Sequence, residues 1–139
     1  VFYESKIETV KNQEDSQKFT WSVFLKNSDI LIGQITCQQK KNQPENIRDV
    51  GWFIAPEYQG QGYATEAAIA VLTFMFEEVD ITDIYTSAAE VNSGSWRIME
   101  KLGFELVGYH QSTYFKDNEI LVSRDYHGTK KFFFNKMKK

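Results

Sequence analysis

The loop Tyr58-Gln59-Gly60-Gln61-Gly62-Tyr63-Ala64-Thr65 stands between a segment of strand character and a long helical segment. Gly60 and Gly62 have no side chain and let the backbone approach a ligand closely, and Ala64 is nearly as small. The first backbone N–H groups of a helix lack intrahelical partners, and the peptide dipoles place partial positive charge there. A loop of this kind therefore suits a pyrophosphate group.

Two other phosphate-binding motifs do not fit this loop. The dinucleotide fingerprint G-x-G-x-x-G needs a third glycine at position 65, where this chain has Thr65. The P-loop needs a Gly-Lys-Ser/Thr ending, which the sequence lacks. A pair of glycines alone also occurs in loops that only connect elements, so the loop needs support from elsewhere in the chain.

The segments around the loop predict an α+β fold. Their hydrophobic patterns predict strands at 19–26, 30–39 and 48–55, a helix at 64–79, a strand at 83–90, a helix at 93–102, and strands at 104–115 and 120–126. Tight turns at 27–29 and 116–118 make their flanking strands antiparallel hairpins. The central strand–helix–strand requires a right-handed crossover between parallel strands. We therefore expect a mixed, mostly antiparallel central sheet with one parallel crossover.

The two ends of the chain carry weaker patterns. Residues 1–18 are mostly polar, and Ile7 and Val10 are spaced for a short amphipathic helix. The tail, residues 130–139, holds five lysines and is interpreted as a solvated charged end. Near the second helix, Gly103 is expected to end the helix in a left-handed conformation, with Phe104 folded back on Met99.

Composition narrows the classes of function. The 139 residues fit a single domain, residues 1–139, and 42% of them are hydrophobic and 25% charged, as in globular proteins. The net charge of −3 argues against a nucleic-acid partner. Cys37 is the only cysteine, which excludes an internal disulfide and a cysteine-based metal cluster and predicts a buried thiol. The sequence shows neither a membrane-spanning run nor a signal peptide, so we expect a cytoplasmic protein without membrane or metal partners.

Two motifs resemble those of the GNAT superfamily of N-acetyltransferases. Gln59-x-x-Gly62-x-Ala64 is similar to the superfamily's Q/R-x-x-G-x-G/A acetyl-CoA motif. Residues 92–104 resemble its next motif, an Asn-x-x-Ser followed by a helix that ends Lys-Leu-Gly-Phe. Together with residues 64–68, they most resemble the RimJ/RimL-like branch, which acetylates the N-terminal residues of ribosomal proteins. The close resemblance covers residues 51–108, and similar small-molecule amine acetyltransferases share these motifs.

The resemblance implies acetyl-CoA as co-substrate and a primary amine as acceptor. It places the CoA pyrophosphate on the loop amides and the pantetheine arm along residues 52–55, whose amides would polarise the thioester carbonyl. The implied cofactor contacts are Phe53, Ile54, Ala55, Gln59, Gly60, Gln61, Gly62, Tyr63, Ala64, Thr65, Asn92, Ser95 and Arg97. The same pattern also suits a helix cap at Asn92, a first-turn residue at Ser95, and exposed helix charges at Arg97 and Lys101.

The acid for the reaction differs from the superfamily's commonest one. An amine with a pKa of about 8–10 must lose a proton before it attacks a thioester, and the thiolate must gain one as it leaves. Many superfamily members use a tyrosine seven residues after the Asn as the acid, and that position here is Met99. The resemblance to the ribosomal-protein branch points instead to the Ser95 hydroxyl.

The base is less well defined. A glutamate that such enzymes place on the strand after Gly108 is replaced here by Tyr114. Glu119 is the main candidate for the base, and Glu90 is a second candidate. Both positions also suit a surface carboxylate. His110 and His127 could titrate near neutral pH, but such histidines also pack or cap a strand end.

These departures leave a second function open, a non-catalytic acyl-CoA-binding or interaction module. The superfamily normally begins with a strand and one or two helices, and here only eighteen residues precede the first hairpin, so the chain looks shortened. For the enzyme, we expect the amine of a protein N-terminus or small molecule to enter between residues 52–55 and 85–90. The residues expected to line that side are Tyr109, Tyr114 and Glu119. A hydroxyl group is a further alternative as the acceptor. The sequence also leaves open whether the protein forms a homodimer.

Overall fold

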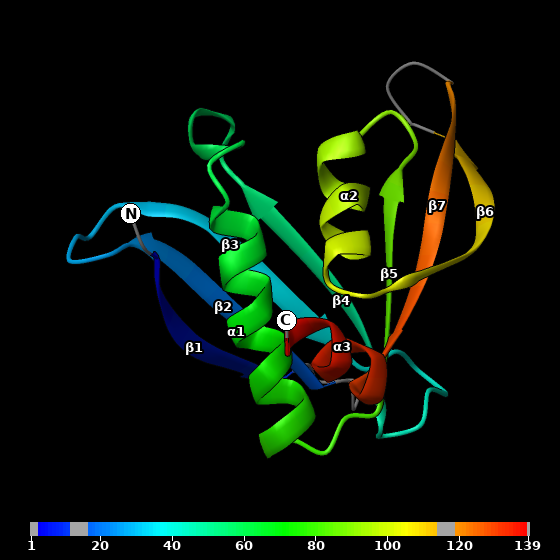
Figure 1. Cartoon of the computed structure of the whole chain (residues 1–139), viewed down its shortest axis with the longest axis horizontal. Coiled ribbons are helices and arrows are strands. Elements are labelled where there is room, and N and C mark those ends of the chain that lie inside the picture. Colours follow the sequence, from blue (N-terminus) through cyan, green and yellow to red (C-terminus); the bar gives the residue numbers. More distant parts are fainter. Residues whose placement is uncertain (1–2, 12–16, 114–118, 139) are drawn as a thin grey trace. The chain divides into compact units, whose positions relative to one another are not determined.

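The computed structural model describes residues 3–11, 17–113 and 119–138 of the chain (Figure 1). The chain divides into two compact units, residues 1–82 and 83–139. Each unit contains strands and helices. Within the described residues, none of the helices is long and apolar enough to cross a membrane.

The sheet of the first unit has its strands in sequence order, and each neighbouring pair is antiparallel. They are β1 (Tyr3–Lys11), β2 (Gln17–Leu25), β3 (Leu31–Gln38) and β4 (Ile47–Ile54). The predicted hairpin at 19–26 and 30–39 is confirmed as β2 and β3. Asn27 in its turn has a φ of 62°, a left-handed conformation that asparagine tolerates.

The prediction of a helix in residues 1–18 is wrong, because most of this segment forms strands. β1 pairs with β2 along its whole length, from Tyr3 opposite Leu25 to Lys11 opposite Gln17. The spacing of Ile7 and Val10 expresses only a local helical preference. Pairing with β2 satisfies the backbone N–H and C=O groups on the side of β1 that faces β2, and that long-range gain decides its conformation.

The helix predicted at 64–79 is confirmed as α1 (Tyr63–Glu78), which follows the short 3₁₀ helix η1 (Pro56–Tyr58). It packs against β1, β3 and β4 and covers one face of this sheet (Figure 1). Its buried residues are Tyr63, Ala67, Ala68, Val71, Leu72, Met75 and Phe76. Trp21 of β2 meets the edge of Phe74 at a centroid distance of 6.3 Å. Burial of large apolar side chains of this kind contributes about 1.5–3 kcal/mol each to folding.

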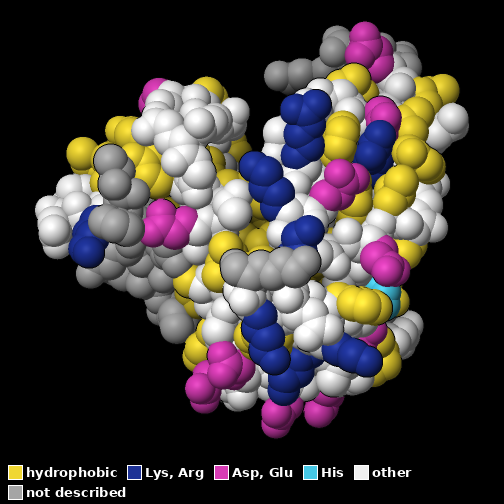
Figure 2. Space-filling model, in the orientation of Figure 1, with side chains coloured by type: hydrophobic (Ala, Val, Ile, Leu, Met, Phe, Trp, Pro, Cys, Tyr) yellow, Lys and Arg dark blue, Asp and Glu magenta, His cyan; other side chains and the backbone are white. Residues whose placement is uncertain are grey.

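The second unit has a three-stranded antiparallel sheet in the order β5, β7, β6. The strands are β5 (Asp83–Ala89), β6 (Glu105–Thr113) and β7 (Ile120–Thr129). The three predicted strands are confirmed, and the predicted turn at 116–118 lies outside the described residues. Along β5, Ile84, Thr86 and Ala88 are buried, whereas Tyr85 and Ser87 point to the exposed face. Hydrophobic side chains reach the surface along the sheet edge formed by β6 (Figure 2).

The helix predicted at 93–102 is confirmed as α2 (Ser93–Lys101), which contacts β5 and β6. It ends as expected. Gly103 has a φ of 89°, and its N–H donates to the Glu100 carbonyl while that of Phe104 donates to the Met99 carbonyl, both at 3.0–3.1 Å. These two bonds form a Schellman motif, which satisfies carbonyls that the helix leaves unpaired.

The lysines of the tail that the structure describes are exposed, as expected, but residues 130–137 form a third helix, α3 (Lys130–Met137), which the sequence did not predict. Thr129 caps it, with its hydroxyl oxygen accepting a hydrogen bond from the Phe132 N–H at 3.2 Å. Phe133 is fully buried. The buried Phe133 ring and the Thr129 cap both help to hold this short basic segment as a helix on its unit.

Candidate functional site

The loop between η1 and α1 holds both of its glycines in the left-handed region. Gly60 has a φ of 77° and Gly62 a φ of 84°. A Cβ built on either glycine would meet no atom within 4 Å, so the space beside both residues is open. An L-residue would cost about 1–2 kcal/mol in this conformation. At these two positions the backbone, rather than a side chain, therefore forms the surface of the loop.

Two glutamines tie the loop to the segment before it. The Gln59 side-chain amide donates to the Ile54 carbonyl at 2.8 Å, so it anchors the loop to the last residue of β4. The Gln61 side-chain amide lies 3.5 Å from the Glu57 carbonyl. The first of these glutamines belongs to the acetyl-CoA motif in the sequence, and in the structure its side chain shapes the loop.

The N-terminus of α1 has no side-chain cap. Gly62 is the N-cap residue, and its carbonyl accepts the first helical hydrogen bond from the Glu66 N–H at 3.0 Å. The amides of the first turn, at Tyr63, Ala64 and Thr65, have no partner in an α-helix and carry the positive end of the dipole. Tyr63 is only 4% exposed as a whole residue, and its ring centre lies 6.5 Å from that of Tyr58.

Residues 53–55, the predicted contacts with the pantetheine arm, differ from one another. Phe53 is 58% exposed, whereas Ile54 is buried. The Ala55 N–H already donates to the Ile32 carbonyl at 2.7 Å. This amide is therefore engaged at the end of the β3–β4 pair, while the other predicted contacts at Phe53 and Ile54 stay predictions.

In the second unit, Asn92 and Ser95 lie together at the start of α2. Asn92 is the N-cap, and its side-chain oxygen accepts a hydrogen bond from the Ser95 N–H at 3.3 Å. Asn92 thus has the capping role that its sequence position also suits. Ser95 is half-buried, and none of the described residues hydrogen-bonds its hydroxyl group. Arg97 and Lys101 are exposed on the same helix.

Other residues that the sequence relates to catalysis or to the acceptor side are Met99, Glu119, Tyr114 and Tyr109. Met99, at the position of the tyrosine acid, is 1% exposed and belongs to the core. Glu119 is exposed one residue before β7 begins. Tyr114 lies outside the described residues. Tyr109 of β6 is 56% exposed, so it is available at the surface of its unit.

Both histidines pair with an aspartate. The His110 Nδ1 lies 2.7 Å from Asp125 Oδ1, and the His127 Nε2 lies 2.6 Å from Asp83 Oδ2. The His127 ring also stacks on Tyr85, with the centroids 4.6 Å apart. Each histidine is therefore held by a carboxylate, as expected of residues that stabilise a sheet face.

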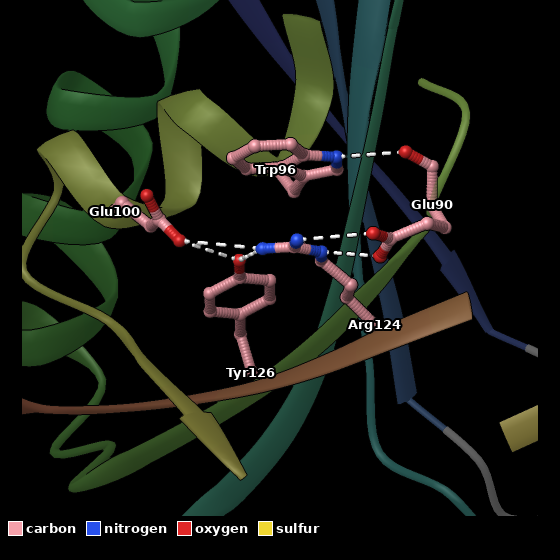
Figure 3. Close-up of polar contacts among 5 residues, drawn as sticks. All are labelled: Glu90, Trp96, Glu100, Arg124 and Tyr126. Carbon is pink, nitrogen blue, oxygen red and sulfur yellow. Dashed lines mark hydrogen bonds and ion pairs between the residues drawn. The ribbon is translucent and has the colours of Figure 1, made fainter. Parts of the chain in front are cut away.

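A cluster that the sequence did not reveal surrounds Arg124 of β7 (Figure 3). Its guanidinium binds both carboxylate oxygens of Glu90, with Nη2 at 3.0 Å from Oε1 and Nε bonded to Oε2. Its Cζ lies 3.9 Å from the centre of the Trp96 ring. The Tyr126 hydroxyl donates to Glu100 Oε2 at 2.8 Å, and Arg124 Nη1 lies 3.4 Å from that hydroxyl.

The charges in this cluster decide which carboxylate can act as a base. The hydrogen bonds that Arg124 donates to Glu90 lower the pKa of Glu90, despite an opposing effect of desolvation, and the same bonds raise the pKa of Arg124. Burial raises the pKa of Tyr126, which stays a hydrogen-bond donor. A carboxylate with a lowered pKa in a two-point ion pair is a poor proton acceptor. Glu90 is thus unsuited to the role of base that was considered for it.

Similar proteins place this architecture in a known family. The model of the acetyltransferase (GNAT) domain matches residues 2–105. The uncharacterized N-acetyltransferase YnaD of Bacillus subtilis is 36% identical over 110 residues, 78% of this chain and 62% of its own length. The putative ribosomal N-acetyltransferase YdaF of the same organism is 31% identical over 74 residues, 53% of this chain and 40% of its own.

A solved structure agrees with these relatives. The GNAT-family acetyltransferase from Bacillus anthracis has a TM-score of 0.71 and 30% identity, covering 81% of this chain and 66% of that one. It confirms the predicted α+β fold class. The chain therefore belongs to the GNAT acetyltransferase family, whose members use acetyl-CoA as acetyl donor.

Proposed function

We propose that this protein transfers the acetyl group of acetyl-CoA to a primary amine, on a protein N-terminus or a small molecule, by direct attack on the thioester. Membership of the family supports acetyl transfer. The resemblance to YdaF, a putative ribosomal N-acetyltransferase, supports an amine acceptor. The chain spans only 62% and 40% of the two relatives described above, so the acceptor is proposed for the protein rather than taken from them.

The observation that carries the proposal is the open loop before the uncapped N-terminus of α1. Gly60 and Gly62 take left-handed conformations, and the space where their side chains would lie is empty of neighbouring atoms. Unpaired amides at a helix N-terminus bind phosphate well, because the N–H groups and the dipole both favour negative charge. These features fit a pyrophosphate, so the amides from Gln59 to Thr65 would hold that part of acetyl-CoA.

The chain's own groups then have distinct tasks. Bound acetyl-CoA supplies an activated acetyl carbonyl, and CoA thiolate is the leaving group. The Ser95 hydroxyl, which has no partner among the described residues, would donate a proton to the thiolate. Removal of the proton from the amine falls to water or to Glu119, since Glu90 is held by Arg124.

The rival function is an acyl-CoA-binding module without turnover. It is favoured by Met99, which is buried at the position of the usual tyrosine acid and offers no proton. Such a module would bind acetyl-CoA through the same loop but would not release CoA in the presence of an amine. A separate measurement of binding and of turnover distinguishes the two functions.

The test combines calorimetry with an assay of thiol release. Titration with acetyl-CoA and with NAD should show binding of acetyl-CoA alone. A panel of peptides with free N-termini, polyamines and simple alcohols should then show steady release of CoA with amines only. Binding without release supports the module, release with alcohols contradicts amine selectivity, and failure to bind acetyl-CoA rejects both functions.

A further inference from the structure

We infer that Arg124 is a positioning residue, which fixes the turn from β5 into α2 and so orients Asn92 and Ser95. The inference rests on the proposed function, because it concerns how Ser95 is held for proton donation. Every contact that carries it lies within the second unit. Arg124 is on β7, Glu90 is the first residue after β5, and Trp96 lies in the first turn of α2 (Figure 3).

The first contact fixes the start of the turn. Arg124 binds Glu90 through two nitrogens, a fork geometry that constrains direction as well as distance. Glu90 is also held by its backbone, since its N–H donates to the Val122 carbonyl at 2.8 Å. Asn92 follows two residues later, and its N–H donates to the Ala89 carbonyl at 2.8 Å. The residue that caps α2 is thus attached to a turn with both ends anchored.

The second contact fixes the helix itself. The Trp96 ring lies over the guanidinium of Arg124, with 3.9 Å from Cζ to the ring centre, and its indole N–H donates to the Glu90 carbonyl at 3.0 Å. A planar guanidinium can stack on an aromatic ring and bind a carboxylate in its own plane at the same time. Trp96 directly follows Ser95, so the rotation of the first helical turn depends on this stack.

The third contact extends the cluster along α2. Arg124 Nη1 lies 3.7 Å from Glu100 Oε2, and the same carboxylate accepts the Tyr126 hydroxyl bond. Arg124 therefore contacts the turn before α2 and two successive turns of the helix. The Arg124 side chain is 18% exposed and that of Glu90 41%. A partly exposed ion pair of this kind stabilises a fold only weakly, so its main effect is on geometry.

The test uses three variants of the full chain. Arg124→Lys keeps the positive charge but loses the two-nitrogen fork and the planar stack on Trp96. Arg124→Ala removes the charge as well as this geometry. The control is Lys130→Met, because Lys130 is an exposed cation at the start of α3. We expect kcat with the best amine to fall roughly 10- to 100-fold in both Arg124 variants, since small misplacement of a catalytic group has effects of that size. The Kd of acetyl-CoA should stay within about threefold.

Two further readouts separate positioning from general stability. Free guanidinium ion at low millimolar concentration should restore part of the kcat of Arg124→Ala and leave that of Lys130→Met unchanged. Hydrogen exchange of the Trp96 indole N–H should accelerate about tenfold or more in the Arg124 variants, because its bond to Glu90 loosens.

The outcomes distinguish this inference from the proposed function. Folded Arg124 variants with wild-type kcat, or with unchanged indole exchange, contradict the positioning role. If Arg124→Ala does not fold, Arg124→Lys decides the matter on the same two measurements. A wild-type protein that releases no CoA with any amine contradicts the proposed function instead, and the exchange rate then shows by itself whether Arg124 fixes the turn.

Discussion

At the scale of single residues, Gly60 and Gly62 are important because they have no side chain. Their positive φ angles and open surroundings leave the backbone of the loop as the surface that a ligand meets. Gln59 contributes in the opposite way, because its side chain turns inward to the Ile54 carbonyl. Recognition by backbone amides needs a fixed loop more than it needs particular side chains.

The first prediction concerns Gly62. In Gly62→Glu, a carboxylate stands beside the amides that would hold pyrophosphate, and a side chain is forced into a left-handed residue. We expect calorimetry to show a loss of acetyl-CoA affinity of about 100-fold or more, equal to about 2.7 kcal/mol. The matched control is Ala70→Glu, which adds the same charge at an exposed site on α1 beyond the first turn. Equal loss in both variants would show that charge alone, and not the loop, is responsible.

The second prediction concerns Cys37, which is fully buried. Burial raises the pKa of its thiol to about 12, and the nearby Arg48 charge opposes this only in part. The pKa of this thiol is higher in the folded protein than in the unfolded chain, where it is about 8.5. The preference of the folded protein for the neutral thiol therefore contributes fully to stability below a pH of about 8.5. This contribution is lost as pH rises toward the folded value. Between roughly pH 9 and pH 12, the free energy of unfolding should therefore fall more steeply in the wild type than in Cys37→Ala.

At the scale of elements, α2 shows how a short helix is defined at both ends. Asn92 caps its first turn, and the Gly103 and Phe104 amides close its last turn. The nine residues between them bury only Met99, so capping supplies much of the stability that packing does not.

The third prediction separates the two roles of Asn92. Asn92→Ala removes the bond to the Ser95 N–H and should lower the free energy of unfolding by about 1 kcal/mol in urea titrations. Asn92→Asp keeps a capping oxygen and should restore that stability. If the Asn92 amide also donates to acetyl-CoA, the Asp variant should still raise the KM for acetyl-CoA roughly tenfold. Recovery of both stability and KM in the Asp variant would leave Asn92 as a cap only.

At the scale of the whole molecule, the chain has two compact units, and each contains strands and helices. The loop proposed to hold pyrophosphate belongs to the first unit, and Ser95 and the Arg124 cluster belong to the second. The expectation that an amine enters between residues 52–55 and 85–90 therefore involves both units and stays a prediction, as does the single domain expected from chain length.

The fourth prediction concerns the stability of the whole chain. A ligand that binds only the folded state stabilises it by about 2.7 kcal/mol at a hundredfold excess over its Kd. We expect saturating acetyl-CoA to raise the Tm by roughly 5–10 °C for a chain of this size. NAD at the same concentration, and acetyl-CoA added to Gly62→Glu, should each leave the Tm unchanged. A shift of equal size in that variant would place the binding site away from the loop.

The sequence by itself determined the elements whose signal is local. The buried face of α1, the end of α2 at Gly103 and the hairpin turn at Asn27 follow from periodicity and from the conformations that glycine and asparagine tolerate. The loop from Gln59 to Thr65 was recognisable for the same reason, because its residue types and spacing are contiguous in the chain.

Only the tertiary structure decided features that join distant residues. β1 is a strand because it pairs with β2, against the helical spacing of Ile7 and Val10. Arg124 meets Glu90 across 34 positions of sequence, and no local pattern links the two. That ion pair lowers the pKa of Glu90, which makes this carboxylate unsuitable as a base. Pairing energies and pKa values depend on neighbours in space, which the order of residues along a chain does not express.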